Sequence, residues 1–223
     1  MLNRKISGPH LFRILITALV LGLLFYSGGF IQITESAGLN SLLIMSAIIL
    51  IPITAFIHIP FRRIQVVHAI PQAPIAGWIV PKRTLYRGHT LIAINLGGAI
   101  LPLIYSVTLY LLFPVTITSF LFVISISTLS SYLLSRPIPG FGIGMPIFST
   151  PIITALATHY IANEHVISTA YIAGTFGVII GADVLRFNDI KKLESSFVSI
   201  GGAGIMDSIV LTGFISVLFV SLL

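Results

Sequence analysis

The sequence has no cysteine among its 223 residues. Disulfides, thiolate metal ligands and cysteine nucleophiles are therefore excluded. Charge is also scarce, because Asp, Glu, Lys and Arg together make up 8% of the chain, whereas a soluble domain carries roughly a quarter. So few charged residues cannot cover the surface of a soluble domain of this length. We therefore predict that lipid is the main solvent of this protein.

Long apolar segments take the place of the missing charge. The chain is 56% hydrophobic, and each segment is close to the length that crosses about 30 Å of hydrocarbon as a helix. These segments predict an all-α polytopic protein of the cell membrane, a single membrane-embedded helical bundle over 1–223. We interpret the first segment as a retained helix, with a cleaved signal peptide as the alternative. The seven predicted spans are 12–33, 39–60, 89–113, 115–134, 146–162, 166–185 and 199–222.

The basic residues predict the orientation of the bundle. With the N-terminus inside and the C-terminus outside, all 12 Lys and Arg residues fall on the cytoplasmic side, as the positive-inside rule requires. The opposite side keeps Glu35 and Glu164 and no basic residue. The net charge of +6 therefore indicates orientation and not a nucleic-acid-binding face.

Two stretches do not fit a regular membrane helix. Residues 61–88 place short β-prone runs on either side of prolines, with Trp78 suited to the interface, so we predict a small cytoplasmic hairpin. An irregular interfacial loop is the alternative. Residues 136–151 are rich in proline and glycine yet apolar. We predict a re-entrant or broken segment beside a functional cavity there, with a tight interfacial turn as the alternative.

Two predicted spans begin with the same Gly-Gly-Ala triplet. One follows Asn95 and Leu96, and the other follows Ser199 and Ile200. Aligning the triplets places Asn95 opposite Ser199 and hints at an internal duplication, as in many transporters. Close helix packing explains small-residue runs equally well.

Asp183 and Asp207 are the candidate functional residues, because each falls within a predicted span near its cytoplasmic end. An intramembrane carboxylate is costly and is a functional candidate by default. The pair fits three roles: paired catalytic acids, a proton or Na⁺ site, or structural partners of Arg186 and of free backbone amides. Asp189, Glu194, Glu35 and Glu164 are interpreted as solvated surface. The histidines show no metal-ligand spacing, and no cofactor motif is present, so we expect neither metal nor cofactor.

Four segments together resemble the prokaryotic membrane family called domain of unknown function 1614. The likeness covers most of 45–222 and is most specific between Gly181 and Gly213. This chain departs from the family pattern at Met206, Ser208 and His58, and both aspartates are in place. The resemblance implies a fold and no activity. The segments are 93–99, 136–143, 181–185 and 199–207.

The aspartate layout is also similar, more distantly, to that of intramembrane aspartyl proteases of the presenilin and prepilin-peptidase type. That likeness implies catalytic roles for Asp183 and Asp207. Here two extra residues separate the glycines from Asp207, a rotation of about 200° on a regular helix. The likeness therefore requires the last span to begin unwound. The candidate substrate-binding residues are Asn95, Gly97, Gly98, Pro137, Gly140, Gly142, Gly201, Gly202 and Gly204.

Three functions remain open from the sequence. An aspartyl protease would take a transmembrane peptide as substrate and would need the two carboxyl groups close together. An ion-coupled carrier would take a small solute and would need pseudosymmetric broken helices. A non-enzymatic assembly subunit would use the small-residue faces for helix packing. In each case the lipid bilayer is the expected partner.

Overall fold

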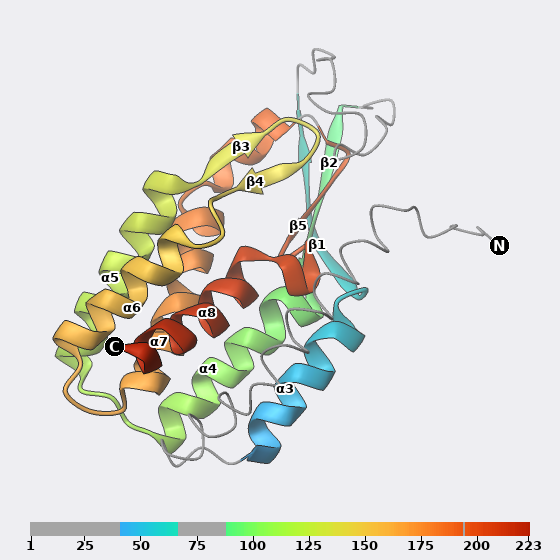
Figure 1. Ribbon diagram of the computed structural model, residues 1–223. Helices are drawn as coiled ribbons and strands as arrows, with labels where there is room; N and C mark the ends of the chain where they lie inside the picture. The colour runs from blue at the N-terminus through green and yellow to red at the C-terminus, as the bar shows by residue number, and fades with distance from the viewer. Residues whose placement is uncertain (1–40, 67–87, 194) are drawn as a thin grey trace.

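The computed structural model describes residues 41–66, 88–193 and 195–223. Within them, helices α3 to α8 form a bundle, and a three-stranded sheet and a β-hairpin lie at one end of it (Figure 1). The predicted first span, 12–33, and Trp78, for which we predicted an interfacial position, lie outside the described residues. The α-helices are α3 (Ser41–Thr54), α4 (Leu101–Leu112), α5 (Ile117–Leu134), α6 (Ser149–Ile161), α7 (Val166–Val178) and α8 (Ser208–Leu222).

Shorter elements join the helices. The strands are β1 (His58–Gln65), β2 (His89–Asn95), β3 (Arg136–Ile138), β4 (Gly142–Gly144) and β5 (Phe197–Ile200). The short helices are the π-helices η1 (Leu96–Ile100) and η2 (Ile179–Val184), and the 3₁₀ helices η3 (Phe187–Leu193) and η4 (Gly204–Met206).

Three predicted spans are shorter as helices than their hydropathy suggests. Helix α3 ends at Thr54, and the spans predicted at 89–113 and 199–222 begin with strands β2 and β5. Hydropathy cannot separate these forms, because a short apolar run suits a buried strand as well as a helix. Two described helices are long and apolar enough to cross a membrane, Ile117–Leu134 and Val166–Val184.

The sheet has the order β1-β2-β5. Strand β1 pairs antiparallel with β2, and these strands flank the region 61–88 of the predicted hairpin, of which residues 67–87 lie outside the described residues. Strand β5 pairs parallel with β2, and Ala93 lies opposite Ser199. The Gly-Gly-Ala alignment, which placed Asn95 opposite Ser199, is therefore offset by two residues from the register of the sheet.

The proline-rich segment near 136–151 contains a β-hairpin followed by the first turn of α6. Strands β3 and β4 pair antiparallel, and the amide of Phe141 donates to the carbonyl of Ile138 at 3.0 Å. Pro139 and Gly140 are the central residues of this turn, and Gly140 has a φ of 75°. A type II turn needs a positive φ at its third position and favours proline at its second. The break in helical structure predicted here is present as a hairpin.

The bundle carries apolar side chains outward and hydroxyl side chains inward. On α5, Leu121, Phe122 and Leu133 are more than half exposed, whereas Ser127 and Ser131 are fully buried. Helix α6 follows the same rule. The fully buried threonines of α6 are Thr150, Thr154 and Thr158, and its exposed apolar residues include Ile152, Leu156 and Tyr160.

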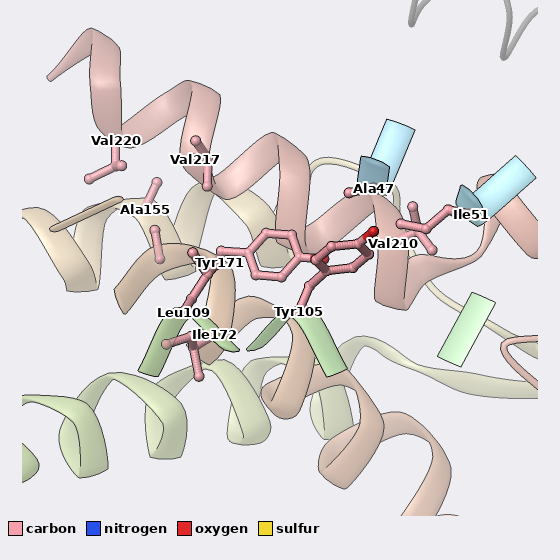
Figure 2. Packing of buried hydrophobic residues seen from close by; sticks show 11 residues of the cluster. Ala47, Ile51, Tyr105, Leu109, Ala155, Tyr171, Ile172, Val210, Val217 and Val220 are labelled. Atoms are coloured by element: carbon pink, nitrogen blue, oxygen red, sulfur yellow. The ribbon is translucent and has the colours of Figure 1, made fainter. Parts of the chain in front are cut away.

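The main core lies between α3, α4, α7 and α8. Tyr105 and Tyr171 meet at its centre, with Ile51, Ile172 and Val210 around them (Figure 2). Two smaller clusters continue the core toward the sheet. One surrounds Val178, Ala182 and Ile209, and the other surrounds Ile92, Ile190 and Leu193.

Candidate functional site

Asp183 lies in the π-helical turn η2, which continues helix α7. This end of the helix approaches α5 closely, because a Cβ atom on Gly181 would overlap the carbonyl oxygen of Thr128. Ala182 is buried, whereas Asp183 itself is partly exposed. The small residues before Asp183 therefore hold its segment against α5.

Asp207 is the N-cap of α8 and does not lie inside that helix. Its φ of −72° and ψ of 144° are extended, and Gly201 and Gly204 before it have positive φ values of 70° and 63°. The unwound start that the aspartyl protease likeness required is present. The span predicted at 199–222 is therefore helical only from Ser208, because the glycines delay the start of the helix.

The carboxylate of Asp207 accepts two backbone hydrogen bonds. Oδ1 accepts from the amide of Ile209 at 3.1 Å, and Oδ2 accepts from the amide of Ala203 at 3.2 Å. Such a side chain satisfies amides that a helix N-terminus leaves unpaired. The structural role considered for Asp207 is therefore real, and any chemical role must coexist with it.

The structure brings Asp183 and Asp207 together. Helices α7 and α8 pack side by side (Figure 1), and Val178, Ala182 and Ile209 share one buried cluster between them. The two carboxyl groups lie close enough to interact electrostatically. Arg186, the sequence-based alternative partner of Asp183, binds Asp189 instead, at 3.0 Å.

The β3–β4 hairpin lies beside the aspartate-bearing ends of α7 and α8. Ile143 and Met145 pack against the cluster that contains Ala182 and Ile209. The amide of Gly140 donates to the carbonyl of Leu193 at 2.7 Å and so ties the turn to η3. Three of the candidate substrate-binding residues, Pro137, Gly140 and Gly142, lie on this hairpin. A Cβ atom at Gly140 or Gly142 would meet open space.

Most of the remaining candidates form a close backbone contact that we call the glycine junction, made of Gly97, Gly98, Gly201 and Gly204. A Cβ atom on Gly98 would overlap the carbonyl of Gly201, and one on Gly97 would overlap the carbonyl of Ile51 on α3. Gly204 faces the side chain of Ala55. Gly202 faces Ser199 instead. The junction joins the two Gly-Gly-Ala segments and α3 directly, which is a packing role.

Asn95 is fully buried where β2 meets η1. Its Oδ1 accepts from the amide of Gly98 at 2.6 Å, and its Nδ2 donates to the carbonyl of Ala55 at 2.7 Å. Both ends of this amide are thus used within the fold. Asn95 holds the start of η1 against the end of α3.

His58 belongs to strand β1 and not to the end of a membrane helix. Its Nδ1 lies 2.8 Å from the hydroxyl of Ser199 on β5, and its ring contacts Phe197 edge-on at 5.5 Å. Burial lowers the pKa of His58 and so favours the neutral ring, and the tautomer of that ring decides whether Nδ1 or the Ser199 hydroxyl is the donor. Sequence reasoning noted His58 but missed Ser199, because the parallel pairing of β2 and β5 is not visible in the chain.

The linker between Asp183 and β5 is held by ion pairs that the sequence analysis missed. Asp189, which we interpreted as solvated, accepts from Arg186 at 3.0 Å and from Lys192 at 2.6 Å. The hydrogen bond from Lys192, together with Arg186, lowers the pKa of Asp189. Arg186 also donates to the hydroxyl of Ser135 and to the carbonyl of Tyr132, both at 2.6 Å. These bonds fasten the segment after Asp183 to the end of α5.

The part of the chain that the structure describes contains no cluster of metal-ligating side chains. No three His, Cys, Asp or Glu residues gather there in a way that could hold an ion. Two interacting carboxyl groups can share one proton, which makes one of them an acid and the other a base. The arrangement therefore suits acid–base chemistry or proton exchange.

Comparison with curated proteins finds no match, and comparison with solved structures finds none either. A family model does match, over residues 44–219, and its description is Protein of unknown function (DUF1614). The matched region contains both aspartates, the glycine junction and the hairpin. Because the match covers most of the chain, as the sequence resemblance implied, this protein belongs to the DUF1614 family.

Proposed function

We propose that this protein is a multi-pass membrane hydrolase in which Asp183 and Asp207 cleave peptide bonds. The observation that carries the proposal is that the segments bearing the two carboxyl groups pack against one another through Ala182 and Ile209, near enough for the charge of Asp207 to act on Asp183. In aspartyl protease chemistry, the ionised carboxylate takes a proton from water, which adds to the peptide carbonyl. The protonated carboxyl group gives its proton to the leaving nitrogen as the C–N bond breaks.

The distribution of side chains supports the membrane part of the proposal. The outer faces of α4 and α5 expose large apolar residues, while serine and threonine hydroxyls lie inside. A water-soluble bundle would bury the apolar side chains and expose the hydroxyls. In lipid, exposing apolar side chains costs no free energy of hydration, and interior hydroxyls form hydrogen bonds between helices. Helices α5 and α7 with η2 are the described segments long enough to cross.

Strand β5 supports a peptide as the substrate class. It pairs with β2 on one side, and no other described strand pairs with its second edge. An unpaired strand edge can bind an extended peptide through backbone hydrogen bonds. Because β5 leads through Gly201 to Asp207, a peptide along this edge would run toward the carboxyl pair.

A transition-state analogue provides the test. We expect a photoreactive peptide that carries a hydroxyethylene group in place of the scissile bond to label the purified wild-type protein. Asp183→Asn and Asp207→Asn should each reduce labelling at least tenfold. Asn is itself a good N-cap, so Asp207→Asn retains an acceptor for the start of α8 and isolates the loss of acid–base capacity.

Glu164→Gln is the matched control for this experiment, because it removes an exposed carboxylate from the connection between α6 and α7, at the opposite end of α7 from the pair. It should label like the wild type. Equal labelling of the wild type, Asp183→Asn and Asp207→Asn would reject the catalytic pair, as would a structure with the two carboxyl groups separated by packed side chains.

A second candidate, an ion-coupled carrier, has one observation in its favour. Strands β2 and β5 run parallel, and each leads through a glycine pair into an apolar helix, as expected for a repeated unit. The same variants distinguish the two functions. A carrier would lose proton or Na⁺ coupling in reconstituted vesicles on Asp183→Asn, and the wild type would not be labelled by the analogue.

A further inference from the structure

Two hydroxyl groups on α7 are buried in the bundle without a hydrogen bond. Tyr171 is 6% exposed and Thr175 is 0% exposed, and neither Tyr171 Oη nor Thr175 Oγ1 has a hydrogen-bond partner among the described residues. The two hydroxyls lie near enough for that of Thr175 to affect the pKa of Tyr171, but the pair does not have the geometry of a direct hydrogen bond.

The side chain of Tyr105 on α4, which carries a third hydroxyl, lies beside that of Tyr171. Tyr105 and Tyr171 interact electrostatically and lie next to each other in the core (Figure 2). The hydroxyl of Ser46 can donate its hydrogen to the carbonyl of Leu43 at 2.7 Å. Either hydroxyl can be the donor in the 2.8 Å bond between Ser46 and Tyr105, and donation by Tyr105 is the direction that also satisfies the Leu43 carbonyl. In that direction the oxygen of Tyr105 keeps its capacity to accept.

Gly213 and Phe214 of α8 lie against these groups. A Cβ atom on Gly213 would approach Thr175 Oγ1 to 2.8 Å and the ring of Tyr171 to 3.1 Å. Phe214 packs edge-on against Tyr171 at 5.5 Å. A buried hydroxyl without a partner costs free energy, and two within reach of one another call for a shared partner.

We propose that a buried water molecule bridges Tyr171, Thr175 and Tyr105, and we call these three residues the hydroxyl site. The water accepts hydrogen bonds from Tyr171 and Thr175 and donates one to Tyr105. Three partners are typical of a buried structural water. The hydrogen bonds then form a chain, in which Tyr105 donates to Ser46 and Ser46 donates to the carbonyl of Leu43. This site is independent of the proposed role of the aspartates.

Isosteric variants test the site, because the change in melting temperature that they cause has the opposite sign when the water is present. If the water is present, Tyr171→Phe and Thr175→Val each break its hydrogen bonds. Each should lower the melting temperature of the detergent-solubilised protein by about 2–4 °C. The double variant should lose less than the sum, because both hydroxyls bind the same water. Removal of dry, unpartnered hydroxyls would leave the melting temperature unchanged or raise it, and either result overturns the proposal.

Thr158→Val is the matched control, since this fully buried hydroxyl donates to the carbonyl of Thr154 in its own helix. Its effect should add to that of Tyr171→Phe. If Thr158→Val is as strongly non-additive with Tyr171→Phe as Thr175→Val is, the coupling does not come from a shared water.

Radiolytic labelling provides a direct measurement on the wild-type protein. X-ray pulses generate hydroxyl radicals from bound water, which oxidise the side chains beside it. We expect oxidation of Tyr171 and Tyr105 despite their burial, and at least a threefold lower rate at Tyr171 in Thr175→Val. Absence of oxidation at Tyr171 in the wild type would overturn the proposal.

Discussion

Arg186 is the residue that fixes the segment after Asp183. Its guanidinium binds Ser135 and Tyr132 at the end of α5 and Asp189 in η3, and it stacks over the ring of Tyr132 at 4.7 Å. A planar group with several donors suits such a point, where three elements converge. The geometry around Asp183 therefore depends on an ion-pair network outside the candidate pair.

The charge of Asp189 contributes to stability in a defined pH range. Its pKa lies below the ordinary value of 3.8, so the folded state favours the ionised form. That contribution is present above pH 3.8 and is lost as the pH falls through the lower, folded-state pKa. We expect Asp189→Asn to destabilise the solubilised protein by about 1 kcal/mol at pH 7, measured by thermal unfolding.

The same comparison at pH 3 is the control for charge. There the difference between wild type and Asp189→Asn should shrink, because the wild-type carboxyl group is increasingly protonated. An equal difference at pH 3 and pH 7 would assign the effect of the substitution to packing.

At the scale of elements, the glycine junction joins parts of the chain that are distant in sequence. It brings η1, the segment from Gly201 to Gly204, and α3 to backbone contact, while Asn95 binds the end of α3 from η1. Close backbone approach requires glycine, because any side chain would occupy the space of a carbonyl group. The position of Asp207 depends on this junction.

A methyl group at the junction should separate these elements. We expect Gly98→Ala to destabilise the fold by about 2 kcal/mol, because its Cβ would overlap the rigid carbonyl of Gly201. Gly144→Ala is the control, since its Cβ would meet only the end of the flexible Ile138 side chain. Equal melting temperatures for the two variants would contradict the close packing of the junction.

At the scale of the whole molecule, charge is divided between the two ends of the bundle. The sheet, the β3–β4 hairpin and η3 lie at one end (Figure 1), and they contain the Lys and Arg residues among those described except Arg186, which directly precedes η3. The connection between α6 and α7, which contains Glu164, lies at the other end. The described residues at the basic end are Arg62, Arg63, Arg136, Arg186, Lys191 and Lys192.

The absence of cysteine makes the proposed orientation directly measurable. Single cysteines at Glu164 and Asn188, both exposed, would be the only thiols in the chain. With the N-terminus inside, a membrane-impermeant maleimide should label Glu164→Cys in intact cells. It should label Asn188→Cys only after permeabilisation. Labelling of both positions in intact cells would contradict a membrane between them.

The sequence by itself determined the apolar character of the chain, the grouping of its basic residues and the break near residues 136–151. These properties depend on local composition, which hydropathy, charge and proline measure directly. It also singled out Asp183 and Asp207, because a carboxylate within an apolar run is conspicuous without knowledge of its neighbours.

Only the tertiary structure decided that 89–95 and 197–200 are strands, that Asp207 caps α8, and that Ser199 meets His58. Each of these depends on a partner far away in the chain. An apolar run becomes a strand when another strand satisfies its backbone, and the parallel pairing of β2 with β5 joins segments about a hundred residues apart. The same long-range packing brings the segments that carry Asp183 and Asp207 to one buried cluster, and local sequence patterns do not encode that packing.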